Sequence, residues 1–120
     1  MEGSLFLFPR RDLETPRLAQ IKSSLRKSRL RREVLTFLAS IYPEASYSYE
    51  ISRALGISAT QVLGAIKGLP KSYEPKNSLL ALELVEEVDW YAVGRIKLYR
   101  ISKLGLRVAN SLLKESYSKR

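Results

Sequence analysis

The stretch EISRALGISATQVLGAIKGL, residues 50–69, decides the fold. It predicts two short helices, over 49–55 and 59–69, and a serine stands before each helix where its hydroxyl can cap the first turn. Gly56 lies between them, where a left-handed residue lets the chain turn sharply. The apolar positions of both helices face a common seam, and these are Ile51, Leu55, Ile57, Val62, Ile66 and Leu69. Two short helices that share an apolar seam across a glycine turn predict a helix-turn-helix.

The flanking sequence predicts helices before the motif and a β-hairpin after it. Apolar residues at helical spacing predict a long helix over 25–42, ended by Pro43, with a short helix over 17–21 before it. Residues 79–84 are expected to form another short helix. Two segments rich in β-branched and aromatic residues, 85–91 and 95–101, predict a hairpin, and Ser102 can cap a last helix over 103–116.

This order predicts an α+β fold, mainly α: a winged helix-turn-helix with a two-stranded wing hairpin and a C-terminal helix. We expect residues 1–23 to be an N-terminal extension that is partly helical, residues 24–117 the winged-helix domain, and residues 118–120 a tail.

Charge and composition narrow the classes of partner. The 120 residues carry 21 Lys and Arg against 12 Asp and Glu, a net charge of +9, so a polyanionic partner is expected. The chain has no cysteine and no apolar run long enough to cross a bilayer, which predicts a cytoplasmic protein. With no His or Cys, no phosphate-binding loop and no zinc-spaced ligands, we expect neither an enzyme nor a metal or cofactor.

Two basic groups are the candidates for phosphate contacts. The first begins the long helix and comprises Arg26, Lys27, Arg29, Arg31 and Arg32. The second belongs to the hairpin and comprises Arg95, Lys97 and Arg100. Cations held near a duplex bind phosphates without reading sequence, so these groups predict affinity rather than specificity.

The run SLRKSRLRREVLTFLASIYPEASYSYEISRALGISATQVLGAIKGL, with LELVEEVDWYAVGRIKLYRISKLGLRV after it, resembles small archaeal winged-helix DNA-binding proteins. These are broadly similar to the MarR and ArsR-type transcriptional regulators, which often have YxLTxxG where this chain has YRISKLG, residues 99–105. The resemblance implies a sequence-specific regulator of transcription whose second motif helix, 59–69, enters the major groove of double-stranded DNA. The implied base-reading positions are Ala59, Thr60, Gln61, Leu63, Gly64 and Lys67.

The last helix has apolar residues on two sides, more than one core contact requires. We therefore expect a homodimer through Leu104, Leu106, Val108, Ala109, Leu112 and Leu113. The N-terminal segment, which includes Phe6 and Phe8, is the alternative cover for this helix.

Two other functions stay open at this level. One is an architectural, nucleoid-type protein that binds duplex DNA with little sequence specificity, and the other is a winged-helix module that binds proteins of the transcription machinery. The base-reading positions favour these alternatives because few of them carry long polar side chains, whereas the two basic groups favour DNA.

Overall fold

The computed structural model describes residues 16–68, 75–90, 94 and 96–118. Its helices, in chain order, are α2 (Pro16–Lys27), α3 (Arg29–Ser40), α4 (Ser48–Leu55), α5 (Ala59–Ile66), the 3-10 helix η1 (Pro75–Asn77) and α6 (Lys103–Ser118). The strands β1 (Val85–Trp90) and β2 (Ile96–Ile101) lie between η1 and α6. They pair antiparallel in the register Val85 to Ile101 and Trp90 to Ile96.

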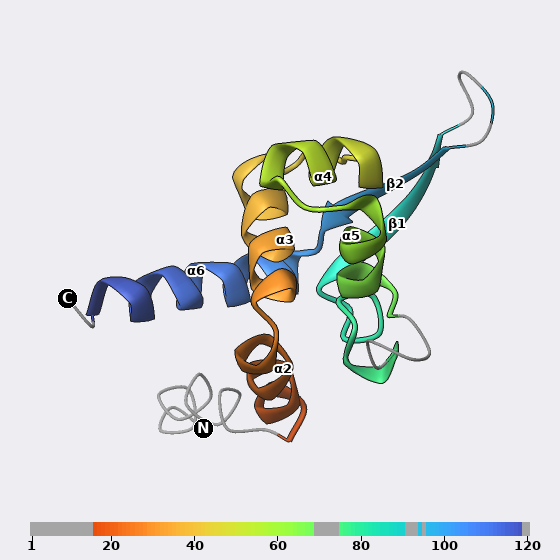
Figure 1. Ribbon diagram of the computed structural model, residues 1–120. Helices are drawn as coiled ribbons and strands as arrows, with labels where there is room; N and C mark the ends of the chain where they lie inside the picture. The colour runs from red at the N-terminus through yellow and green to blue at the C-terminus, as the bar shows by residue number, and fades with distance from the viewer. Residues whose placement is uncertain (1–15, 69–74, 91–93, 95, 119–120) are drawn as a thin grey trace, which may run out of the picture.

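Helix α3 lies at the centre, and the other elements pack around it (Figure 1). Its Val34, Leu35 and Leu38 are fully buried, and the same core takes in Val62 of α5 and Tyr99 of β2. The prediction of an α+β, mainly helical fold with a two-stranded hairpin and a C-terminal helix is confirmed, and this order of elements is compatible with a winged helix.

The structure corrects the expected helix boundaries before the motif. One long helix over 25–42 was expected, but the chain breaks at Ser28, which is extended (φ −136°, ψ 109°). The Ser28 hydroxyl accepts a hydrogen bond from the backbone N–H of Arg31 and thereby caps α3. The short helix expected over 17–21 is longer in the structure, because α2 continues through Ser24, whose buried hydroxyl donates to the carbonyl of Asn77 at 2.6 Å. A hydroxyl that finds such a partner no longer competes with the helix backbone.

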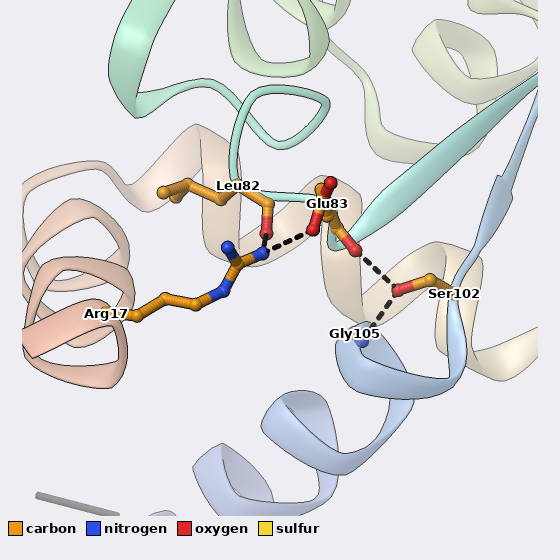
Figure 2. A network of polar contacts seen from close by, with 5 residues as sticks. All are labelled: Arg17, Leu82, Glu83, Ser102 and Gly105. Atoms are coloured by element: carbon orange, nitrogen blue, oxygen red, sulfur yellow. Dashed lines mark hydrogen bonds and ion pairs between the residues drawn. The ribbon is translucent and has the colours of Figure 1, made fainter. Parts of the chain in front are cut away.

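A polar network ties the start of α2 to the segment before the hairpin (Figure 2). The Arg17 guanidinium donates to the carbonyl of Leu82 at 3.0 Å and to the carboxylate of Glu83 at 2.7 Å. The Ser102 hydroxyl donates to the Glu83 carbonyl at 2.7 Å and accepts from the backbone N–H of Gly105 at 2.9 Å. Helix α2, the segment around Glu83 and the first turn of α6 are therefore joined.

The expected short helix over 79–84 is wrong. These residues form turns instead, and Glu83 adopts a left-handed backbone with φ 62°, which ends any right-handed helix. The turn brings the carbonyl of Leu84 against Gly105 of α6, where a Cβ atom would collide with that oxygen. Gly105 is therefore required for the close approach of α6 to the hairpin.

Candidate nucleic-acid interface

Helices α4 and α5 form the predicted helix-turn-helix. Gly56 ends α4 in the left-handed conformation with φ 70° and ψ 31°, so the chain turns where expected. Ser58 caps α5 by accepting from the backbone N–H of Gln61 at 3.1 Å. At α4 the structure differs from the expectation: Tyr47 is the N-cap residue, without a side-chain hydrogen bond, and Ser48 is the first helical residue.

The outer face of α5 holds the residues expected to read bases. Thr60 and Lys67 are exposed, while Ala59 and Leu63 are partly buried. Gln61 is exposed, but its side-chain oxygen accepts from the backbone N–H of Ser58 at 3.0 Å and completes a capping box.

Gly64 departs from the expectation that it faces the groove. It is buried together with Ala65 and Ile66 on the inner side of α5. Among the expected base-reading positions, the exposed polar side chains are therefore those of Thr60, Gln61 and Lys67.

The hairpin cations are paired with acids of the opposite strand. Glu87 of β1 lies 3.4 Å from the Nζ atom of Lys97 in β2 and 3.7 Å from the Nζ atom of Lys67 after α5. On the other face of the hairpin, Arg100 meets Glu86 at 3.0 Å. Arg95, the remaining expected cation of the wing, lies outside the described residues.

The first basic group divides into two sets in the structure. Arg26 and Lys27 are exposed at the C-terminal end of α2, and Arg29 is exposed and paired with Glu33 at 2.6 Å. Within the described residues, Arg26 and Lys27 have no acidic partner within 4.0 Å.

Arg31 and Arg32 instead point back to α2, contrary to the expectation that they contact phosphates. Arg31 is buried and donates to the carbonyl and the hydroxyl of Ser24 at 3.2 and 3.3 Å. Arg32 donates to the carbonyls of Leu25 and Arg26 at 2.6 and 3.1 Å. These carbonyls are among the last of α2 and lack partners within the helix, so both guanidinium groups cap it.

An aromatic cluster at α4 includes Arg53, which sequence reasoning did not connect with it. The rings of Tyr47 and Tyr49 stack with centroids 6.5 Å apart, and both are exposed. The guanidinium of Arg53 lies 5.8 Å from the centre of the Tyr49 ring and donates to its hydroxyl at 3.3 Å. The signal was present in the i, i+4 spacing of Tyr49 and Arg53 on one helix face.

Helix α6 uses part of its expected dimer surface inside the monomer. Val108 and Ala109 are buried in the core, and Leu104 and Leu106 pack against it. Leu113 is 45% exposed. The residues expected to cover this helix from the N-terminal segment, Phe6 and Phe8, lie outside the described residues.

Two further features of the described residues concern membranes and metals. None of the helices in this part of the chain combines the length and apolar character needed to span a bilayer. The same part of the chain brings no three His, Cys, Asp or Glu side chains together as a metal site.

Comparison with known proteins found a matching family model and a curated relative. A family model described as EarA-like matches residues 21–112. An uncharacterized protein of Methanocaldococcus jannaschii, MJ0905, is 37% identical over 89 residues, which cover 74% of this chain and 78% of that protein. No solved structure matches. The matches agree with the expected small archaeal protein, while the resemblance to MarR and ArsR-type regulators stays a prediction.

Proposed function

We propose that this chain, which belongs to the EarA-like family, binds double-stranded DNA and regulates transcription. In the proposed complex α5 lies in the major groove, and the hairpin contacts the adjacent backbone.

The observation that carries the proposal is the shared contact of Lys67 and Lys97 with Glu87. Lys67 follows α5 and Lys97 belongs to β2, so one carboxylate joins the helix end and the hairpin into a single surface. A duplex that approached this surface would meet both ammonium groups, and its phosphates would compete with Glu87 for them. Thr60 and Gln61, at the other end of α5, supply polar groups for base edges.

Arg26 and Lys27 support the proposal from the end of α2. They lie on a chain of net charge +9, and contacts of this kind supply binding that falls steeply with salt. The two inward arginines, Arg31 and Arg32, are not needed for this surface because they stabilise the end of α2.

Selection from random duplexes tests the proposal, followed by fluorescence anisotropy with the selected sequence and a scrambled one over a salt series. A regulator should prefer the selected duplex by roughly a thousandfold or more. Thr60→Ala should reduce that preference, because it removes a candidate base contact. Lys67→Ala should weaken binding, whereas the matched control Arg107→Ala, an exposed cation on α6, should leave it unchanged.

A second candidate function is an architectural protein that binds duplex DNA without an operator. Two observations favour it: the Gln61 side chain is held in the capping box, and Gly64 is buried. Both reduce the number of side chains that can read bases. Equal affinity for the selected and scrambled duplexes, with a steep dependence on salt, would favour this function over the regulator.

Absence of binding to either duplex at moderate salt would contradict both functions. The protein-interaction module would then be the remaining proposal, with the same basic surface directed at acidic proteins.

A further inference from the structure

An apolar groove lies between α3 and α6, apart from the surface described above. Its volume is about 440 Å³, and it is lined by Phe37 of α3, Leu55 at the end of α4, and Leu112 and Leu113 of α6. Arg32 and Glu33 of α3 also line it. Such a groove, flanked by an exposed leucine, is typical of a binding surface for another helix.

Helix α6 extends away from the body of the molecule (Figure 1). Its first half is anchored by Gly105, Val108 and Ala109, which are buried. The residues that follow Ala109 are exposed or partly buried as far as Lys114. Leu112 packs against the core from this half of α6, whereas Leu113 is 45% exposed and is left for packing from outside the monomer.

We propose that the groove and the far half of α6 form a two-fold interface between two copies of this chain. In this interface the α6 of each copy lies in the groove of the other, with Leu113 against Phe37. One face of the molecule carries both the projecting helix and the groove that accepts a helix. This is what a two-fold interface requires, because both copies use the same patch.

The charge on this face favours a second copy over a nucleic acid. Arg32 and Glu33 of α3 place both signs of charge at the groove. In a two-fold interface, the charges of Arg32 and Glu33 in one copy can face the opposite charges of the other copy. A duplex would instead meet the Glu33 carboxylate and an apolar lining.

Sedimentation velocity of the full chain without DNA tests the proposal over about 1 to 100 µM, a range that detects a dimer of micromolar affinity. We expect a dimer. Leu113→Glu should raise its dissociation constant at least roughly thirtyfold, as for a central apolar contact. The control Ser111→Glu changes an exposed residue 200° away around the helix and should leave the dimer intact. Thermal melting of both variants checks that they fold.

Crosslinking identifies which surfaces meet in the dimer. The chain has no cysteine, so Thr36→Cys in the groove and Leu113→Cys on α6 introduce single thiols. A mixture of the two variants should form crosslinked pairs with a short bismaleimide, and a mixture of Thr36→Cys with Ser111→Cys should not.

A wild-type monomer at the highest concentration would overturn the proposal. A dimer that persists in folded Leu113→Glu, or that gives no Thr36 to Leu113 crosslink, would also overturn it. Because these measurements contain no DNA, they stand or fall separately from the proposed function.

Discussion

Lys67, at the C-terminus of α5, has its ammonium nitrogen 3.7 Å from a carboxylate oxygen of Glu87 in β1. The same carboxylate lies 3.4 Å from Lys97 in β2. The proposed DNA surface therefore contains an acidic group at its centre. In the free protein this carboxylate holds the two cations together, and in a complex it would lie close to phosphates.

We expect Glu87→Gln to strengthen DNA binding. Removal of a negative charge about 4 Å from a phosphate contributes about 1 kcal/mol at low salt, or roughly fivefold in affinity, and less at high salt. Anisotropy titration at two salt concentrations measures the effect. Glu86→Gln is the matched control, because Glu86 pairs with Arg100 on the opposite face of the hairpin and its removal should change binding less. Equal effects of the two variants would contradict the docking we propose.

Substitution of Arg31 should affect mainly stability, whereas substitution of Arg26 should affect mainly DNA binding. Arg31→Met should lower the free energy of unfolding by about 2 kcal/mol, since it removes charged hydrogen bonds to Ser24 at the end of α2. Arg26→Met should leave stability within about 0.5 kcal/mol and weaken DNA binding, because Arg26 is exposed and has no acidic partner among the residues that the structure describes. Urea denaturation and anisotropy measure the two effects. The reverse pattern would show that Arg31 belongs to the DNA surface.

Gly105→Ala should be strongly destabilising, by about 3 kcal/mol or more, because its Cβ would collide with the backbone carbonyl of Leu84. A backbone atom cannot move aside as a flexible side chain can. Thermal unfolding checks this, with Asn110→Ala as the control at an exposed position of the same helix. A small loss at Gly105 would mean that α6 can shift away from the hairpin without cost.

Tyr99 should make stability dependent on pH in the alkaline range. Burial, followed by the charge of Glu87, raises the pKa of the Tyr99 hydroxyl above its usual value of 10.0. The unfolded chain then loses this proton at a lower pH than the native protein. The contribution of Tyr99 to stability is therefore complete below about pH 10 and is lost as the pH rises further.

Tyr99→Phe should reduce the loss of stability at alkaline pH. Urea unfolding at a series of pH values from about 8 to 11, which bracket the pKa of tyrosine in the unfolded chain, measures the effect. The exposed Tyr42→Phe serves as the control. An unchanged pH dependence in Tyr99→Phe would contradict the assignment.

Local signals in the sequence predicted much of the fold. The capping serine before α5, the left-handed Gly56 and the β-branched segments of the hairpin act over a few residues, and each appears in the structure where it was expected. The break at Ser28 was missed because it depends on Ser24 and Arg31 finding partners across the helix junction. A helix was wrongly expected at Glu83 because nothing in the local sequence indicates its left-handed backbone. That backbone goes together with contacts to Arg17 and Ser102, which are distant in the sequence.

The candidate site was harder to predict for the same reason. The sequence indicates which residues are cationic, but the ion pairs of Lys67, Lys97 and Arg100 depend on strand register and on how α5 meets the hairpin. The inward direction of Arg31 depends on the carbonyls that end α2. Residue type therefore predicted the sign of the surface, while long-range packing determined which cations remain available.

The central claim is that α5 and the hairpin bind duplex DNA, and the most direct test compares the selected duplex with its scrambled counterpart by anisotropy over a salt series. We predict a preference of roughly a thousandfold or more for the selected duplex, reduced by Thr60→Ala. No binding to either duplex at moderate salt would contradict the claim.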